Sequence, residues 1–274
     1  MKDNFIHFLD GLLYVMLSRN CNPGDILITQ KLLPKQIKCS EDAKNANIKL
    51  EEKHYQREIE IEEIKKKFYL IAYQNVRSLK KHMADIKDFP ELFNFDVFCA
   101  AETWIKQSDD LTSYHLKKFH HHSNSYGKGK GLFIYYKMGE ILQDITTKFL
   151  QITVMQYHNL LIIFIYRSKY CDLSEFLLHL LQIHAKFSNP LKIIVGDFNF
   201  NASENNCITH YLNSMNYIQH VNLPTHIKGN ILDHFYTTKF NLNCFVNVKP
   251  TYFSDHCLLL GHFNMFNDSS MLEI

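Results

Sequence analysis

Five polar side chains in this sequence lie at the ends of apolar segments or within one, and their types suit phosphate chemistry. Asn75, Glu102 and Asp197 each follow an apolar run, in the strings QNV, AETW and GDFN. Asp233 lies inside the apolar string ILDHFY, where burial of a lone carboxylate would be costly. His256, in the string SDH, precedes the last apolar run. Strand ends at one edge of a sheet converge, so we expect these side chains to share one cleft.

The carboxylates and amides in this set indicate hydrolysis of a phosphodiester with a divalent metal. Glu102 offers a hard oxygen ligand for Mg²⁺, for which Mn²⁺ would substitute. Asp197 would orient or deprotonate the attacking water. Asn75 and Asn199 would fix that water and donate a hydrogen bond to a phosphate oxygen.

The imidazole of His256 would meet charge on the phosphoryl oxygens. Asp233 would hold that imidazole in one orientation, as carboxylate–histidine pairs do. The metal and the hydrogen-bond donors together would stabilise charge that develops in the transition state.

Each element also has a plainer interpretation when taken alone. GDFN is compatible with a type I turn that has Asp at its corner, and SDH with a helix or strand cap. Glu102 by itself is compatible with a surface carboxylate. The order of these elements, each at a strand end, is what favours a catalytic site.

The segments that must position these side chains alternate apolar strands with amphipathic helices. Strands are predicted at 68–73, 96–101, 132–136, 152–156, 160–166, 191–195, 245–248 and 257–263. Ser78 is predicted to cap a helix that ends before Pro90, and Asp172 to cap a second one. Strands outnumber helices, and helices fall between them. This pattern predicts one α/β domain with mixed sheets flanked by helices.

Composition excludes several classes of protein. With 274 residues and 46% hydrophobic residues the chain has enough apolar material for a core. Lys plus Arg number 30 against 28 Asp plus Glu, which excludes a histone-like basic binder. The seven cysteines contain no C-x-x-C pair, which excludes a zinc knuckle or a disulfide framework. No apolar run approaches the roughly 20 residues that cross a bilayer, so we expect an intracellular chain without membrane association.

Four segments are predicted along the chain. An apolar piece spans 1–37, and a charged segment spans 38–67. We interpret the charged segment as a linker because its acidic residues balance the basic ones. The catalytic domain is predicted at 68–266 and a tail at 267–274.

The order of the motifs resembles the endonuclease/exonuclease/phosphatase family. The matching strings are NVRSL at 75–79, AETW at 101–104, IYRS at 165–168, GDFN at 196–199, LDHFYTT at 232–238 and SDH at 254–256. They look most like the apurinic-type endonuclease domains of non-long-terminal-repeat retrotransposons and related mobile elements such as Helitrons. The resemblance implies a four-layered α/β sandwich with two facing mixed sheets, and Mg²⁺-dependent nicking of double-stranded DNA.

The resemblance also implies a role for each matching residue. These roles are metal binding for Glu102, Asn75 and Asp255, activation of water for Asp197, phosphate contact for Asn199 and Tyr166, and a His256–Asp233 pair. Two departures from the family stand out. Lysines separate the glycines of the string GKGKG at 127–131, and His234 replaces the usual aliphatic residue. His234 lies next to Asp233 and is therefore a possible competitor of His256 for that carboxylate.

The strings YVMLSR at 14–19 and GDILI at 24–28 resemble the last conserved motif of superfamily-one DNA helicases. There, an arginine at the position of Arg19 reaches the γ-phosphate of a neighbouring ATP site. The chain has no glycine-rich phosphate loop with Lys and Ser/Thr, so it is not an ATPase by itself. We interpret the piece as a helicase remnant, and an amphipathic segment that spells the motif by chance is the alternative.

Two other functions remain open at this stage. A small-molecule or lipid phosphodiesterase or phosphatase of the same fold would use the same catalytic set. A catalytically silent, nucleic-acid-binding relic is the second. Under the first interpretation the partners are DNA and the helicase or transposase machinery of the parent element, and a nuclear location follows from the substrate. The sequence does not fix the oligomeric state.

Other residues are given structural interpretations. We predict a solvated loop at 120–122, which is three histidines, and core packing for Trp104. Some basic residues near the expected cleft are candidates for phosphate contact: Lys80, Lys81, Lys117, Lys118, Lys128, Lys130, Arg167 and Lys169.

Overall fold

A computed structural model describes residues 69–89, 94–124, 127–238 and 242–265, together with Lys49 and Glu52. The chain divides into two compact units, 1–66 and 67–274. All strands of the described ranges belong to the second unit. The predicted helicase-like piece at 1–37 and the tail at 267–274 lie outside the described residues, as does the linker at 38–67 apart from Lys49 and Glu52.

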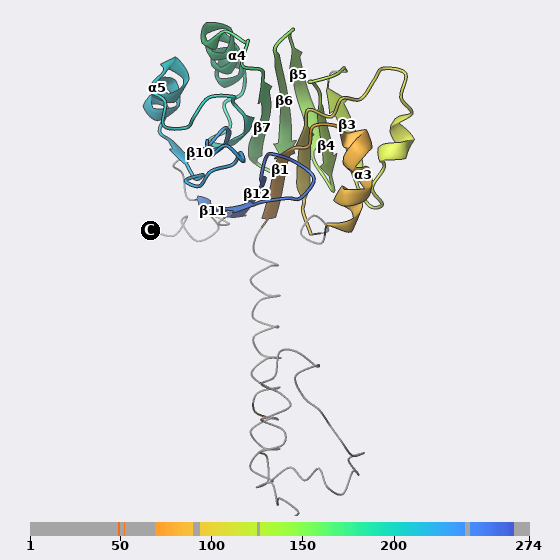
Figure 1. Cartoon of the computed structure of the whole chain (residues 1–274). Helices are drawn as coiled ribbons and strands as arrows, with labels where there is room; N and C mark the ends of the chain where they lie inside the picture. Colours follow the sequence, from red (N-terminus) through yellow and green to blue (C-terminus); the bar gives the residue numbers. More distant parts are fainter. Residues whose placement is uncertain are drawn as a thin grey trace, which may run out of the picture. The chain divides into compact units, whose positions relative to one another are not determined.

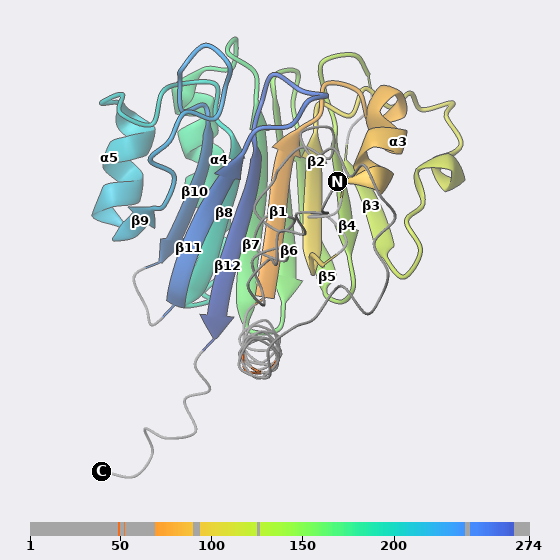
Figure 2. The ribbon, with the colours of Figure 1, turned by 60° about the horizontal axis from the view of Figure 1, so that its bottom comes forward.

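The described part of the chain contains two mixed sheets of six strands each (Figures 1 and 2). The first holds β1 (Tyr69–Asn75), β2 (Val97–Ala101), β3 (His120–Asn124), β4 (Leu132–Tyr136), β11 (Leu242–Lys249) and β12 (Leu258–Met265). The second holds β5 (Glu140–Thr146), β6 (Leu150–Tyr157), β7 (Leu160–Arg167), β8 (Leu191–Asp197), β9 (Tyr217–Gln219) and β10 (Asp233–Thr238). Their orders are β11-β12-β1-β2-β4-β3 and β5-β6-β7-β8-β10-β9.

The two sheets share one pairing pattern. Each has a single parallel pair at its centre, β1 with β2 and β7 with β8, and antiparallel pairs elsewhere. A parallel pair needs a crossover connection, and helices α3 (Leu79–Asp88) and α4 (Leu173–Lys186) lie in those connections. The carboxyl ends of each parallel pair therefore lie at one edge of its sheet, which is where the predicted site residues stand.

Both predicted helices are confirmed, and so are their caps. The Ser78 hydroxyl accepts a hydrogen bond from the backbone N–H of Lys81, and the Asp172 carboxylate accepts one from Ser174. Each cap satisfies an N–H group that has no partner inside the helix. No helix in the described ranges has the length and apolarity to cross a lipid bilayer.

Three layers of apolar side chains hold the domain together. The central layer lies between the sheets and includes Ile71, Phe164 and Phe235. A second layer joins the outer face of the β5–β10 sheet to α4 and to a short helix, α5 (Cys207–Ser214). The third joins the outer face of the first sheet to α3. The predicted four-layered α/β sandwich with two facing mixed sheets flanked by helices is confirmed.

The predicted loop at 120–122 is wrong, because these histidines begin the edge strand β3. His121 stacks on Phe133 of β4, with 5.2 Å between the ring centroids. The Nε2 atom of His122 lies 2.7 Å from Asp144 Oδ2 on the edge strand of the facing sheet. Aromatic and polar contacts across the sheet edge thus favour a strand that composition alone did not indicate.

Several short elements were not predicted from the sequence. They are β3, β5, β9, β10, α5 and a 3₁₀ turn at Leu111–Tyr114, and of these only β10 had been recognised as an apolar stretch. The pattern of β5 shows why, since its burial alternates only weakly and two of its seven residues are acidic. Such edge strands lack a continuous apolar signal because only part of one face is buried.

Close packing of the sheets depends on Gly261 in β12. A side-chain carbon at this position would overlap the ring of Phe235, which projects from β10 and is fully buried. We expect Gly261→Ala to lower the free energy of unfolding by about 2 kcal/mol, because the ring has no free space to enter. Phe235→Leu should cost stability alone but less in the Gly261→Ala background. Denaturant unfolding of the two single variants and the double variant measures this coupling, and strictly additive losses would contradict the assigned contact.

Candidate active site

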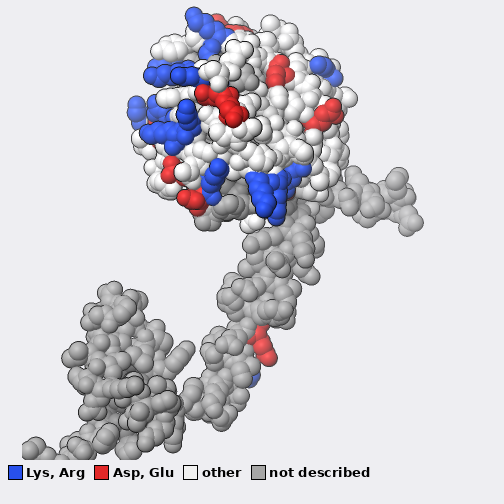
Figure 3. Space-filling model, turned by 90° about the vertical axis from the view of Figure 1, so that its right-hand side faces the viewer, with Lys and Arg blue, Asp and Glu red and all other residues white. Residues whose placement is uncertain are grey.

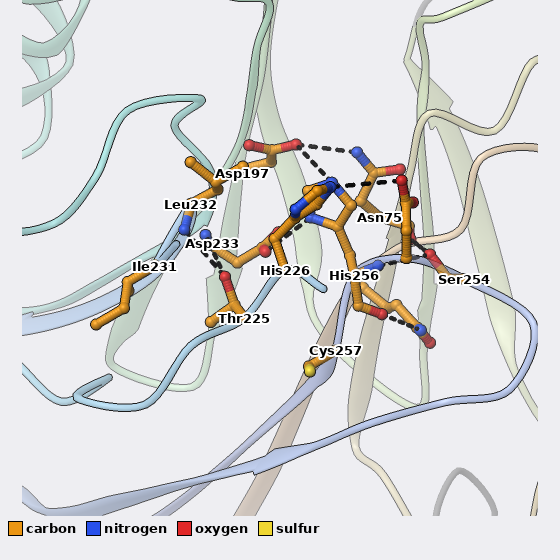
Figure 4. A network of polar contacts seen from close by, with 12 residues as sticks. Asn75, Asp197, Thr225, His226, Ile231, Leu232, Asp233, Ser254, His256 and Cys257 are labelled. Carbon is orange, nitrogen blue, oxygen red and sulfur yellow. Dashed lines mark hydrogen bonds and ion pairs between the residues drawn. The ribbon is translucent and has the colours of Figure 1, made fainter. Parts of the chain in front are cut away.

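Asn75 joins the two sheets at the predicted site. Its side-chain amide donates one hydrogen bond to Glu102 Oε1 and one to Asp197 Oδ2, both 2.9 Å long. Asn75 ends β1, Glu102 follows β2 and Asp197 ends β8 in the facing sheet. The amide therefore binds one carboxylate from each sheet, as Figure 4 shows for Asp197. The prediction that these strand ends converge is confirmed.

His256 lies between two buried carboxylates. Its Nδ1 atom is 2.8 Å from Asp233 Oδ2, and its Nε2 atom is 4.0 Å from Asp197 Oδ2 (Figure 4). Asp233 is fixed in turn, because the backbone N–H groups of Leu232 and Asp233 both donate to the Thr225 hydroxyl at 3.0 Å. The imidazole is thus held in one orientation with Nε2 directed at the carboxylate that ends β8.

The surroundings raise the pKa values of both His256 and Asp197. Burial disfavours the charged imidazole and lowers the pKa of His256, but Asp233 and Asp197 outweigh this and raise the pKa to about 9. Burial, together with the neighbouring charge of Asp233, raises the pKa of Asp197 to about 7. At neutral pH the site therefore holds an imidazolium beside a carboxyl group that is readily protonated.

A buried tyrosine that the sequence did not single out supports Asp197. The Tyr73 hydroxyl accepts a hydrogen bond from the Asp197 backbone N–H at 2.8 Å and donates one to the Ile165 carbonyl at 3.1 Å. Tyr73 belongs to β1, while Ile165 and Asp197 belong to the facing sheet. Its string, AYQN, is typical of an ordinary buried strand, so only the facing sheet reveals this role.

Glu102 receives two further hydrogen bonds. Tyr166 donates its hydroxyl to Glu102 Oε1 at 3.1 Å, and the indole N–H of Trp104 donates to Oε2 at 3.2 Å. The interpretation of Trp104 as core packing needs correction, since its ring is half-buried and Lys128 Nζ lies 5.7 Å above it. Glu102 and Trp104 adopt φ values of 49° and 55°, left-handed conformations that are uncommon outside glycine and often mark functional sites.

Asn199 and Arg167 fix the ends of β7 and β8. The Asn199 backbone N–H donates to Asp197 Oδ1 at 2.9 Å, and its side-chain amide donates to the Arg167 carbonyl at 2.8 Å. Arg167 is buried, and its guanidinium donates to the carbonyls of Phe198 and Cys171. Arg167 is therefore a structural residue and not one of the phosphate-binding cations. Phosphate contact by Asn199 stays a prediction.

His234 does not compete for Asp233. Its Nε2 atom lies 3.1 Å from the Phe200 carbonyl and 3.2 Å from that of Ile231, and its ring stacks on Phe198. Nδ1 accepts a hydrogen bond from the Tyr236 hydroxyl at 3.3 Å. Burial lowers the pKa of His234 to about 4, against the opposing effect of those carbonyls. The carboxylate of Asp233 therefore contacts His256 and not His234.

Asp255 is the centre of a second group that includes His226. Its Oδ2 atom lies 2.5 Å from Arg77 Nη1 and 3.4 Å from His226 Nε2. Burial raises the pKa of Asp255, but His256 and Arg77 outweigh it and the net pKa is lowered. Asp255 is therefore charged at neutral pH. The sequence analysis did not select His226, although its string PTHIKG lies just before the Asp233 motif.

The residues at this edge fit a divalent cation. The ligand atoms of His226, Asp255 and His256 lie within 4.8 Å of one another, and so do those of Asp197, Asp233 and His256. Asp255 Oδ1 is buried without a hydrogen-bond partner in the described part of the chain, as is Asp233 Oδ1. A buried carboxylate oxygen in this state is suited to a metal ion. Glu102 stands outside both groups, so its role as a ligand stays a prediction, as does that of Asn75.

The chain is similar to known proteins in structure but not in sequence. No family model matches the sequence, and no curated protein matches it. Solved structures do match. An AP endonuclease from Archaeoglobus fulgidus is 14% identical with a TM-score of 0.58, and the match covers 72% of this chain and 100% of that one.

Two further solved structures have similar scores. The 3'-5' exonuclease NExo from Neisseria meningitidis is 12% identical with a TM-score of 0.56, over 72% of this chain and 100% of that one. The endonuclease domain of TRAS1, a telomere-specific non-LTR retrotransposon, is 13% identical with a TM-score of 0.55, over 72% and 98%. The chain has the endonuclease/exonuclease/phosphatase fold. At these identities the likeness establishes the fold alone, and the chemistry must be argued from the site.

Removing the indole N–H of Trp104 should weaken metal binding. Trp104→Phe keeps an aromatic ring under Lys128 but leaves Glu102 Oε2 without that donor. We expect about a tenfold loss of affinity for Mn²⁺ in titration calorimetry, because partners that orient a ligand contribute on this scale. Met138→Ala, an exposed change at the opposite edge of the sheet, serves as the control. Equal affinity of Trp104→Phe and the unaltered protein would refute the orienting role.

His234 should make the domain sensitive to mild acid. In the unfolded chain its pKa is about 6.5, whereas burial holds it near 4 in the folded domain. The unfolded state then binds more protons between these values, so stability is present above pH 6.5 and is lost as the pH falls toward 4. The loss attributable to this residue is about 3 kcal/mol.

The comparison of the unaltered protein with His234→Gln isolates this contribution. Glutamine can still donate to the two carbonyls but does not titrate. We expect the free energy of unfolding to fall more steeply in the unaltered protein between pH 6.5 and 4. Parallel curves would show that His234 is not the titrating group.

Proposed function

We propose that the chain is a divalent-metal-dependent phosphodiesterase that nicks DNA. The contact chain from Asp233 through His256 to Asp197, and from Asp197 through Asn75 to Glu102, carries the proposal. It brings Asp197, His256 and Glu102 together, which supports their proposed roles as base, cationic donor and metal ligand. The fold shared with nucleases, among them an AP endonuclease and a retrotransposon endonuclease domain, supports a nucleic-acid substrate.

In this proposal Asp197 accepts a proton from the attacking water. The water oxygen forms a bond to phosphorus, and the bond from phosphorus to one ester oxygen breaks. The leaving oxygen takes up a proton from solvent, Asp197 later returns its proton to solvent, and the products are a phosphomonoester end and a hydroxyl end. Asn75 holds Asp197 Oδ2 in place through its amide, and the Asn199 backbone N–H holds Oδ1. Both oxygens are therefore oriented before substrate binds, which lowers the cost of reaching the transition state.

His256 supplies positive charge where the phosphoryl oxygens become more negative. Its Nδ1 atom is engaged with Asp233, so Nε2 is the atom free to donate to substrate. Tyr166 and Asn199 are proposed to contact the phosphate. A divalent cation held by Glu102, with Asn75 and Asp255 near it, would neutralise charge on the phosphoryl and leaving oxygens. We propose Mg²⁺ as that ion, with Mn²⁺ as a substitute, from the preference of hard cations for oxygen ligands.

We also propose an origin in a mobile element. The likeness to the TRAS1 endonuclease domain and the order of motifs support it. The helicase-like strings at 14–28, with Arg19, point to a Helitron-type parent and to helicase or transposase partners. A nuclear location follows from a DNA substrate.

Nicking of supercoiled plasmid tests the catalytic proposal. The purified chain should nick with Mg²⁺ and stop on addition of chelator. Asp197→Asn and Glu102→Ala should each reduce the rate at least about a hundredfold, because each removes a group that acts on the reacting atoms. Asp172→Asn is a matched control, since asparagine caps α4 as well as aspartate does.

Two results would count against this function. Unchanged nicking by both site variants would place the activity elsewhere or in a contaminant. Turnover of an inositol phosphate or a sphingolipid, with no nicking of DNA, would favour a small-molecule phosphodiesterase of the same fold.

A further inference from the structure

A hollow of about 490 Å³ adjoins the candidate active site on the side of Asp255. Its lining includes Arg77, Lys81, Trp104, Ile227, Tyr252 and Asp255. We refer to it as the Tyr252 groove. Its volume lies within the roughly 300–1,000 Å³ of sites that enclose small ligands. Arg77 and Trp104 follow the strands that supply Asn75 and Glu102, so the groove opens directly beside the proposed reacting phosphate.

Two large side chains in the lining of the Tyr252 groove are exposed. Tyr252 is 74% exposed and Ile227 is 77% exposed. The Tyr252 ring packs edge-on against Phe253, with 5.4 Å between the ring centroids. The ring is therefore packed on one side, while most of its surface stays open to solvent. An aromatic ring fixed in this way binds a flat partner with little loss of side-chain entropy.

Positive charge borders the same groove. The side chain of Arg77 is 50% exposed although it pairs with Asp255, and Lys81 is exposed on α3. A second hollow of about 230 Å³ lies on the Tyr166 side of the site, lined in part by Lys128, Lys130 and Lys148. Figure 3 shows several Lys and Arg side chains close together along one border of the domain. Basic groups that track a backbone, combined with an open aromatic face, are what single-stranded nucleic acid requires.

The exposed ring of Tyr252 favours a substrate with an unpaired base. In a paired duplex each base is covered by its neighbours, so no base face is available to an aromatic side chain. A duplex would contact the basic residues but would leave the Tyr252 face and Ile227 in water. An unpaired nucleotide can fill the groove and cover both.

We propose that the Tyr252 groove binds an unpaired nucleotide beside the scissile phosphate, with its base stacked on Tyr252 and its phosphate near Arg77 and Lys81. This inference rests on the proposed function and names the substrate class of the same site. The substrate strand then presents at least one unpaired nucleotide at the site, in a single strand, a bulge, a flap or a locally unpaired stretch of supercoiled DNA.

Binding without divalent metal tests the proposal, because no cleavage then occurs. The probes are a labelled single-stranded oligonucleotide, its fully paired duplex and a duplex with one unpaired nucleotide, measured by fluorescence anisotropy with the full chain. Tyr252→Ala should weaken binding of the first and third probes about tenfold, as expected for loss of one stacked base. Tyr252→Phe, which keeps the ring, should bind within about twofold of the unaltered protein.

A second variant keeps the test independent of Tyr252. Ile227 is exposed, so Ile227→Asp should fold normally, and its charge should repel a phosphate in the groove. It too should weaken the two probes with unpaired nucleotides more than the paired duplex. Met138→Ala, at the opposite edge of the sheet, should leave all three affinities unchanged.

Two outcomes would overturn the inference. Equal losses on all three probes would mean that Tyr252 serves a general surface contact, and no loss on any would mean that a nucleotide does not occupy the groove. Failure of the proposed function is a separate result, because the unaltered chain with Mg²⁺ would then nick no DNA.

Discussion

The burial of two carboxylates on neighbouring strands is the constraint on which the site depends. Asp197 and Asp233 are direct partners in the antiparallel pairing of β8 with β10, and both are fully buried. Two such charges in an apolar interior repel each other and lose their hydration. The imidazolium of His256 faces both and offsets this cost, which is why burial does not lower its pKa overall. The pKa values of Asp197 and His256 are therefore set together.

The matched architecture of the two sheets brings the remaining groups to this cluster. Each sheet contributes a central parallel pair whose carboxyl ends lie at one edge, and the two edges meet across the central apolar layer. Two side chains of β1 make polar contacts with the facing sheet. Tyr73 reaches the backbone of Asp197, and Asn75 reaches its carboxylate. A small rotation of one sheet against the other would break both contacts, so close packing at positions such as Gly261 also serves the geometry of the site.

Local pattern was enough to predict most of the fold. Long apolar runs such as β7 identify buried strands, and Ser78 and Asp172 identify the helices that follow them. The edge strands were not predicted, because each buries only part of one face. His121 and His122 are the clearest example, since their strand conformation depends on Phe133 and on Asp144 of the facing sheet. His226 was not selected because its partner, Asp255, lies far along the chain. Trp104 was interpreted as core packing because the sequence does not show that its ring stays half-buried with the indole N–H directed at Glu102.

The sequence by itself determined which elements form and which side chains stand at their ends, because apolar periodicity and capping act over a few neighbouring residues. It also placed Asp197 and His256 in one set through their position beside strands, and Asp233 with them as a carboxylate inside an apolar stretch. Only the tertiary structure decided that His256, and not His234, contacts Asp233. The reason is that the two imidazoles meet different partners, His234 facing backbone carbonyls and an aromatic ring while His256 faces two carboxylates. The protonation of each imidazole depends on the charges that surround it in the folded domain. Its neighbours along the sequence do not reveal those charges.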